Sequence, residues 1–314
     1  MIDSPDFSKV PVTRIDDARL LRRDVQLRLF RLDLVDPVLG GNKWFKLYQN
    51  LIQARQAGAM TLLSFGGAWS NHLCALAEAG QRYGFRTIGI IRGELPATLN
   101  PVLQFVLSRD MQLVPVSRTD YRQRHDPDFI KQLLDQHGPA WVIPEGGANL
   151  AGVAGCKALA SLLLEQVDDL AGSEICLACG TATTLAGLVA GLQSADLSPA
   201  PKLTGHVVLK GGEPLTAEVA GWLQQLGADP ADANWRLDTQ DAHFGGYAKQ
   251  PRSLLDFIAD FSAQHDIPLE PVYSGRLMAA IFTRLERGEY QPGTRLLALH
   301  TGGLLAAKVP RSTD

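Results

Sequence analysis

A lysine that follows two glycines is the first residue of this chain whose surroundings suit covalent chemistry. Lys43 lies in GGNKWFKL (residues 40–47), near an expected helix start. Two glycines let the backbone approach a ligand closely, and the positive end of a helix disfavours the ammonium form of a nearby lysine. A lysine that can lose its proton is what Schiff-base chemistry needs. Judged by spacing alone, a surface lysine is the commoner explanation, and Lys46 is the nearby alternative or a supporting residue.

A second glycine-rich turn, SFGGAWSNH (residues 64–72), ends in residues that often begin helices. Ser70 and Asn71 are ordinary N-cap residues, and capping is a sufficient reason for them to be there. If the turn is functional, their side chains and the first free amides of the helix face a carboxylate or a phenolic oxygen. His72 lies inside the first turn, where we expect a structural role.

A third turn, CGTATTLAG (residues 179–187), gathers small residues and hydroxyls before an expected helix. Backbone amides in such a nest, helped by threonine hydroxyls, suit a phosphate. The turn lacks the GK[ST] of a Walker A loop and the GxGxxG of a dinucleotide fingerprint. Cys176 and Cys179 have CxxC spacing, but no second pair follows, so we expect core thiols and no metal site.

Short apolar runs that alternate with amphipathic stretches predict an α/β fold with parallel sheets. Each run is apolar through its length, as in strands buried on both faces. The expected strands are residues 61–67, 86–93, 111–116, 140–147, 174–180, 206–212 and 295–303, and the expected helices are 71–83, 153–167, 214–226 and 253–264. Asn100 and Pro101 read as an N-cap followed by proline at the first helical position.

Composition indicates an ordinary globular protein. The 314 residues are 46% hydrophobic and 20% charged, with a formal net charge of -3. This charge gives no reason to expect nucleic acid or an anionic membrane as a partner. The first twenty residues carry no apolar stretch typical of a secretory signal, and four cysteines are too few for a disulfide scaffold. We expect a cytoplasmic protein that assembles as a homodimer.

Seven motifs occur in one order, and together they resemble a known family. They are GGNKWFKL, GGAWSNH, IPEGGANLAGVAG, CGTATTLAG, HFGGYAK, LEPVYSGRLM and LALHTGG. The chain, from about Leu34 to Gly303, is similar to the fold-type-II pyridoxal 5'-phosphate (PLP) enzymes of the D-cysteine desulfhydrase and 1-aminocyclopropane-1-carboxylate (ACC) deaminase family. The resemblance implies a two-domain, tryptophan synthase β-like fold. Residues 48–156 would form the small domain, and 1–47 with 157–314 the large PLP-binding domain.

The resemblance also assigns residues to roles. Lys43 would carry PLP as a Schiff base and act on the substrate with Ser70, Tyr247 and Tyr273. The other cofactor contacts would be Asn71 at the ring oxygen, Gly180, Thr181, Ala182, Thr183 and Thr184 around the phosphate, Ser274 at the pyridine nitrogen and Thr301 on the same side of the ring. The substrate would be a small amino acid.

Several residues depart from the family pattern. Phe45 and Trp69 replace smaller or more polar residues and would alter the substrate pocket, and Ala182 replaces a common glycine. ACC deaminases resemble one another in having glutamate at the Ser274 position and leucine at the Thr301 position. Two hydroxyls there favour β-elimination from D-cysteine, a reaction with a good leaving group. ACC deamination, serine dehydration and racemisation stay open, as does a PLP-binding protein with little catalysis.

Overall fold

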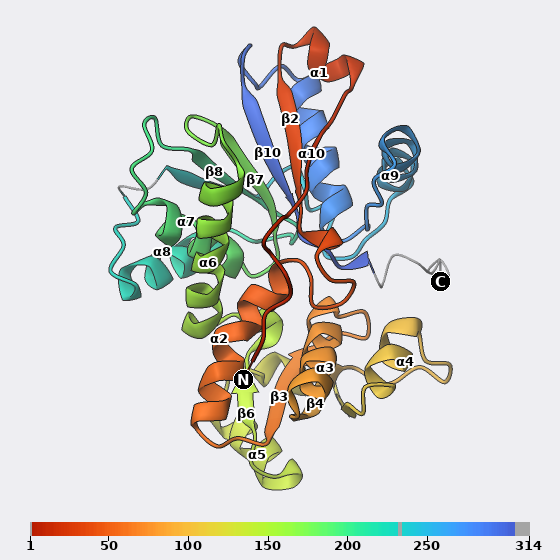
Figure 1. Ribbon diagram of the computed structural model, residues 1–314. Coiled ribbons are helices and arrows are strands. Elements are labelled where there is room, and N and C mark those ends of the chain that lie inside the picture. Colours follow the sequence, from red (N-terminus) through yellow and green to blue (C-terminus); the bar gives the residue numbers. More distant parts are fainter. Residues whose placement is uncertain (1, 232–233, 305–314) are drawn as a thin grey trace.

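The computed structural model describes residues 2–231 and 234–304, which form two lobes, each built on its own sheet (Figure 1). The larger lobe contains β1 (Val12–Arg14), β2 (Gln26–Arg31), β7 (Glu174–Cys179), β8 (Lys202–Val207), β9 (Trp235–Asp238) and β10 (Arg295–His300). Their order in the sheet is β1-β2-β10-β7-β8-β9. Neighbouring strands run parallel, except that β1 is antiparallel to β2.

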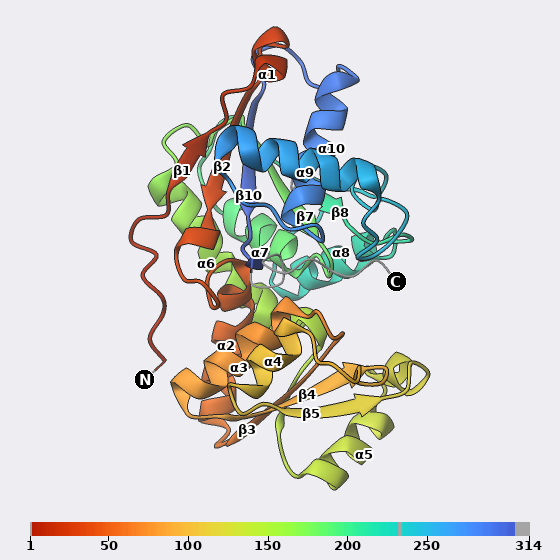
Figure 2. The same ribbon diagram turned by 90° about the vertical axis from the view of Figure 1, so that its right-hand side faces the viewer.

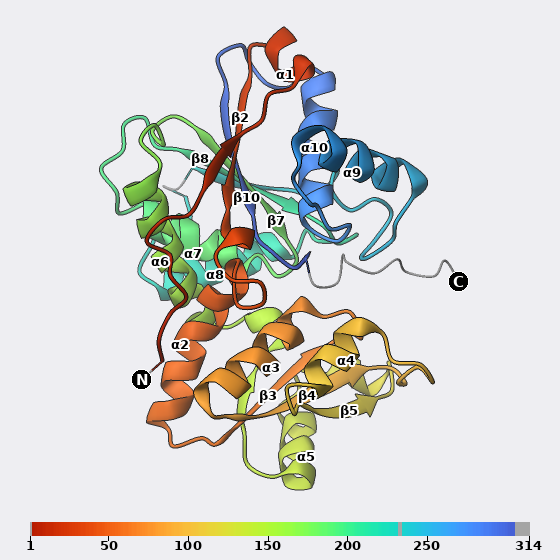
Figure 3. The same cartoon turned by 45° about the vertical axis from the view of Figure 1, so that its right-hand side comes forward.

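The smaller lobe has a wholly parallel sheet. Its strands β3 (Thr61–Gly66), β4 (Arg86–Arg92), β5 (Gln112–Val116) and β6 (Trp141–Ile143) pair in the order β5-β4-β3-β6. Its helices are α2 (Asn42–Gln56), α3 (Asn71–Tyr83), α4 (Pro101–Leu107) and α5 (Pro127–His137). Figures 2 and 3 show α2, α3 and α4 on the face toward the larger lobe and α5 on the opposite face.

Helices cover both faces of the larger sheet, and the alternation of side chains along β7 shows why. Ile175, Leu177 and Cys179 pack in one core cluster with α6 (Leu150–Gln166) and α7 (Thr183–Leu192). Cys176 and Ala178 point the other way and pack with α9 (Arg252–His265) and α10 (Ser274–Glu286). Side chains of a strand alternate between faces, so a run that is apolar throughout fits a sheet buried on both sides. Two further helices, α1 (Ala18–Arg22) and α8 (Leu215–Gln225), complete the lobe.

The two lobes meet through closely packed helices. One core cluster contains residues of α2 and α3 from the smaller lobe together with α6 and α7. The approach requires glycine, because a Cβ on Gly155 of α6 would lie 2.0 Å from the carbonyl oxygen of Phe45 in α2. A Cβ on Gly187 of α7 would likewise lie 2.4 Å from the Cβ of Cys156. The backbones of α2, α6 and α7 therefore form a tight unit that joins the sheets.

The α/β fold with parallel sheets is confirmed, and so is the N-cap at Asn100. Two predicted strands were wrong over part of their length. Strand β8 ends at Val207, so residues 208–212 leave the sheet, and β6 ends at Ile143, so residues 145–147 of the predicted strand 140–147 form a short 3-10 helix. Strands β1, β2 and β9 were not predicted. The domain boundaries at 47/48 and 156/157 stay a prediction, since they fall inside α2 and α6. Within the described residues, no helix has both the length and the apolar character to cross a membrane.

Candidate active site

A cavity of about 900 Å³ opens where segments of both lobes face each other. Turns that follow β3, β6 and β7 contribute to its wall, as does the first turn of α2. Most of the predicted site residues line it: Lys43, Ser70, Asn71, Gly180, Thr181, Ala182, Thr184, Tyr247, Tyr273 and Thr301. Thr183 and Ser274 are not among the lining residues, and both are buried. Chain segments far apart in sequence therefore meet at the carboxyl ends of strands, where α/β proteins bind ligands.

Lys43 is held in the first turn of α2 by a short hydrogen-bonded chain. Its Nζ donates to Oδ1 of Asn42 at 2.8 Å, and Nδ2 of Asn42 donates to Oγ1 of Thr184 at 2.9 Å. Burial, and after it the positive charge of Lys46, lowers the pKa of Lys43 to about 7. A substantial fraction of this amine is therefore unprotonated, and so nucleophilic, at neutral pH.

The turn between β7 and α7 is suited to an anion. Ala182, the N-cap of α7, makes no side-chain capping bond, so the first amides of the helix receive no hydrogen-bond acceptor from their cap. Lys46 is buried, and its Nζ donates to Oγ1 of Thr181 at 3.2 Å. A buried cation thus lies beside the amino end of a helix, an arrangement that favours phosphate.

The turn after β3 places polar groups on the opposite wall. Ser70 caps α3, and its Oγ accepts a hydrogen bond from the amide of Leu73 at 3.2 Å. Oδ1 of Asn71 is buried and has no hydrogen-bond partner among the described residues. Nε2 of His72 lies 2.9 Å from Oγ of Ser64. Burial, with the charges of nearby lysines, lowers the pKa of His72 to about 3, so the ring is neutral.

Two tyrosines extend from the lysine toward solvent. Nζ of Lys43 lies 5.4 Å from the centre of the Tyr273 ring. The Tyr273 hydroxyl is 3.5 Å from that of Tyr247, whose side chain is 51% exposed. Burial raises the pKa of Tyr273 well above its ordinary value, so the phenol keeps its proton. The pair offers a route for a proton between the cavity and the surface.

The loop that carries Tyr247 is anchored by a fully buried arginine. The guanidinium of Arg276 donates to the carbonyl oxygens of Ala242 at 3.3 Å and His243 at 2.5 Å, and also to that of Lys249. Its Nε bonds the carbonyl oxygen of Pro271 at 2.9 Å. Arg276 therefore joins this loop to the start of α10, where Tyr273 lies.

The start of α10 is organised by a buried carboxylate. Glu270 accepts hydrogen bonds from the amides of Val272, Tyr273 and Ser274 at 2.6–2.7 Å. Its own amide donates to Oγ of Ser274 at 2.9 Å. Beside this helix start, Thr301 lines the cavity, and a Cβ on Gly41 would lie 2.1 Å from its carbonyl oxygen. This wall presents hydroxyl groups, while the Glu270 carboxylate is occupied by backbone amides.

Phe45 corrects one expectation about the pocket. It does not line the cavity but is buried against Phe7, with ring centres 4.8 Å apart. Helical spacing explains this, because Lys43 and Lys46 are three residues apart and share a face, whereas Phe45 points away from it. Trp69 does line the cavity.

Sequence reasoning understated one side chain at the site, Lys46, and missed two others, Asn42 and Arg276. Lys46 faces the turn around Thr181, although its i, i+3 spacing from Lys43 was a usable signal. Asn42 links Lys43 to Thr184, and Arg276 anchors the Tyr247 loop. The sequence carried no local signal for the last two, since Thr184 lies 142 residues from Asn42 and His243 lies 33 residues from Arg276.

Comparison with protein families identifies the family to which this chain belongs and the cofactor of that family. The model of the family described as "Pyridoxal-phosphate dependent enzyme" matches residues 10–302. The chain belongs to this family of PLP-dependent enzymes. The resemblance recognised from the seven motifs is thereby confirmed, and PLP is the cofactor of this enzyme.

Relatives of this PLP-dependent enzyme are distant but match along their length. A D-cysteine desulfhydrase of Yersinia enterocolitica is 26% identical, over 93% of this chain and 89% of the relative. A Pyrococcus furiosus protein provisionally named an ACC deaminase is 26% identical, over 91% and 87%. A crystal structure of an ACC deaminase homologue has a TM-score of 0.80 at 24% identity, covering 95% of this chain and 90% of that one.

The residues present fit PLP. A partly deprotonated lysine, Lys43, suits its aldehyde, and the amide-rich turn with Lys46 suits its phosphate. The orphaned Oδ1 of Asn71 shows a polar group without a partner on the wall between them. A ligand that carries an aldehyde, a polar ring substituent and a phosphate satisfies all three features.

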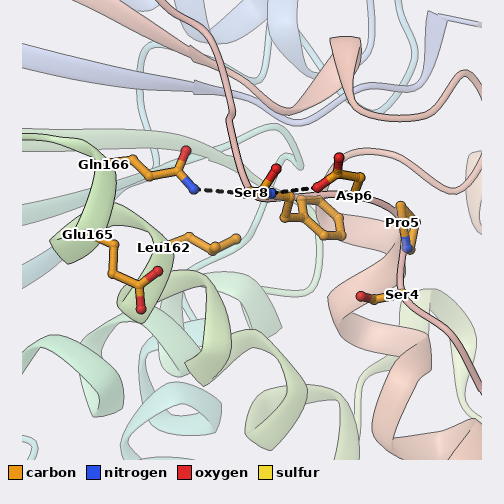
Figure 4. A pocket seen from close by; sticks show the side chains of 8 residues that line it. Ser4, Pro5, Asp6, Ser8, Leu162, Glu165 and Gln166 are labelled. Carbon is orange, nitrogen blue, oxygen red and sulfur yellow. Dashed lines mark hydrogen bonds between the residues drawn. The ribbon is translucent and has the colours of Figure 1, made fainter.

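A second hollow, of about 740 Å³, lies between the N-terminal segment and α6 (Figure 4). Gln166 holds this segment there, with hydrogen bonds to the carbonyl oxygen of Phe7 and the amide of Val10. Asp6 and Glu165 are the ionisable residues that line it. Figure 4 shows Glu165 turned away from Asp6, so the hollow gathers no cluster of reactive groups.

Proposed function

We propose that this PLP-dependent enzyme is a lyase that acts on a small amino acid by β-elimination. The leading substrate is D-cysteine, which would give a keto acid, ammonia and sulfide. Relatives named as D-cysteine desulfhydrase support this reaction class. The observation that carries the proposal is the wall built by the start of α10 and the end of β10, where Thr301 lines the cavity and the hydroxyl of Ser274 is buried at the helix start.

PLP, when bound, supplies an electron sink for the charge left at the substrate's α-carbon. A carboxylate beside the ring nitrogen would keep that nitrogen protonated and strengthen the sink, whereas a hydroxyl donates a hydrogen bond to a neutral nitrogen. The hydroxyl of Ser274 accepts from the amide of Glu270 and donates to Oε1 of Glu270 at 3.4 Å, a long hydrogen bond that it would exchange for one to the ring nitrogen. A weaker sink suits substrates that carry a good leaving group, such as a thiolate.

The chain's own groups have separable roles in this proposal. Lys43 attaches the cofactor, and its amine, with a pKa of about 7, takes the α-proton. Tyr273 keeps its proton and can donate it to the leaving group, with Tyr247 relaying a proton from the surface. Ser70 and Asn71 hold the substrate carboxylate and the ring oxygen, and the turn at 180–184 with Lys46 holds the phosphate.

Release of keto acid from five amino acids, measured in parallel on the PLP-loaded enzyme, tests the proposal. The panel is D-cysteine, L-cysteine, β-chloro-D-alanine, D-serine and ACC. We expect turnover of D-cysteine and β-chloro-D-alanine and none of ACC. Robust turnover of ACC would contradict the argument from the hydroxyl wall and support the ACC deaminase assignment that other relatives carry. No release from any of the five would favour a PLP-binding protein with little catalysis.

A further inference from the structure

The cavity reaches beyond the groups that PLP and a three-carbon amino acid use. Its lining also includes Arg92, Arg124 and His125 of the smaller lobe and Glu218 and Trp222 of α8 in the larger lobe. None of these residues belongs to the seven motifs, and none has a role in the proposed elimination.

Strand register places Arg92 next to the turn that binds the substrate. Gly66 of β3 pairs with Ile91 of β4 in a parallel ladder, so Arg92 lies beside Gly67, where the turn to Ser70 begins. Adjacent strands are about 4.8 Å apart. A substrate anchored at Ser70 and Asn71 therefore has its side chain within reach of the long Arg92 side chain.

The two arginines differ in their charge balance. Nε of Arg124 lies 2.8 Å from Oε2 of Glu145. The other carboxylate oxygen of Glu145, Oε1, accepts a hydrogen bond from the Tyr121 hydroxyl at 2.8 Å. Arg92 forms no ion pair with a carboxylate in the part of the chain that the structure describes. Its guanidinium is an uncompensated cation in the wall of the cavity that holds Lys43, and its planar fork of donors matches an acid group.

We propose that Arg92 forms a subsite for a second acidic group, so that the site takes, besides D-cysteine, amino acids whose side chain ends in a carboxylate or a similar anion. The inference rests on the proposed function, because it takes the turn at Ser70 as the anchor of the substrate's α-carboxylate. In elimination, Lys43 takes the α-proton, and the electron pair of that C–H bond forms the double bond between the α- and β-carbons. The bond from the β-carbon to the substituent breaks, and the substituent leaves with the bonding electrons and a proton from Tyr273, while its acid group stays on Arg92.

Binding of an isosteric pair to the PLP-loaded enzyme tests the subsite. D-glutamate and D-glutamine differ only in the distal carboxylate and amide, and neither carries a β-leaving group. Dissociation constants from titration calorimetry should favour D-glutamate by about tenfold, which corresponds to about 1.4 kcal/mol. Arg92→Met should abolish this preference while leaving the affinity for D-glutamine unchanged.

Arg86→Met is the matched control, because Arg86 lies exposed at the opposite end of the same strand and does not line the cavity. It should keep the preference for D-glutamate. Equal affinities for the two ligands in the unmodified enzyme would overturn the subsite, as would a loss of both affinities in Arg92→Met. Tighter binding of D-ornithine than of D-glutamine would overturn it too, and would point to Glu218. Keto-acid release from β-chloro-D-alanine, measured separately, shows whether the elimination itself has failed.

Discussion

Lys43 and Lys46 place two amines on one face of α2, and burial lowers the pKa of each. The pKa of Lys43 falls to about 7 from the ordinary 10.5. Lys46 contributes to that fall by charge repulsion and also donates to Thr181. In the proposed site, one side chain would therefore serve two ends of the cofactor, its phosphate and the amine that binds its aldehyde.

The pH dependence of cofactor attachment follows from this pair. Only the free amine attacks an aldehyde, so the rate at which the apo-protein takes up pyridoxal should rise through pH 7 and level off above it. Lys46→Met removes the repelling charge, which raises the pKa of Lys43 and moves the profile to higher pH. Pyridoxal without its phosphate keeps phosphate binding out of the comparison.

Borohydride reduction fixes the bound pyridoxal to its lysine, and peptide mapping locates the labelled lysine. Lys46→Arg keeps the charge and should keep the profile, and Lys43→Ala should take up no label. A profile centred near 10.5, or a label on Lys46, would contradict the assignment.

At the scale of elements, the turn into α7 holds a strained residue. Ala182 has φ of +50 and is buried, a conformation that costs an L-residue of order 1 kcal/mol. Ala182→Gly should therefore raise the free energy of unfolding of the apo-protein slightly, by up to about 1 kcal/mol in urea titrations. Ala182→Val should lower both stability and PLP affinity, since a branched side chain fits this conformation poorly. Equal PLP affinity in all three proteins would mean that the phosphate lies elsewhere.

The contact between α2 and α6 gives a second test at this scale. Gly155→Ala inserts a methyl group 2.0 Å from the carbonyl oxygen of Phe45 and should lower the free energy of unfolding by about 1–3 kcal/mol. Gly221→Ala in α8 meets no atom within 4 Å and should stabilise the protein by about 0.5–1 kcal/mol. Urea unfolding of both variants measures the difference, and an unchanged Gly155→Ala protein would contradict the close approach.

The sequence predicted the central strands because they are apolar on both faces. It did not predict β2, where Gln26 and Arg28 interrupt the apolar run, or β9, a four-residue strand containing Arg236 and Asp238. Residues 208–212 were predicted as strand because they continue the apolar run of β8. Val208 is indeed buried, but it lies beyond the end of the strand.

The residues of the site also differ in how far the sequence could predict them. Residues in local motifs, such as Lys43 and Ser70, could be named from sequence and do line the cavity. The roles that depend on long-range contacts could not. Arg276 anchors a loop thirty-three residues away, and the buried Glu270 organises the start of α10. Spacing in the sequence does not report such contacts.

At the scale of the whole molecule, groups from both lobes surround one cavity. PLP binding should therefore protect backbone amides on each side, at the start of α3 in the smaller lobe and at the start of α7 in the larger one. Hydrogen exchange of the apo- and PLP-loaded proteins, followed by mass spectrometry, measures this protection. Free ligand at 100 times its dissociation constant should add about 2.7 kcal/mol to stability. Protection confined to one lobe would contradict a site that both lobes share.

Because of their strand orders, the two sheets can be completed at different stages of synthesis. The four strands of the smaller lobe are contiguous in the chain, between residues 61 and 143, so their sheet can close as soon as they have emerged from the ribosome. In the larger lobe β10 lies between β2 and β7, and it follows every other strand in the chain. The ribosome must make residues 295–300 before β2 gains its parallel neighbour. Thr301, which immediately follows β10, is made after the other residues that line the cavity, so cofactor loading at a complete site must wait for it.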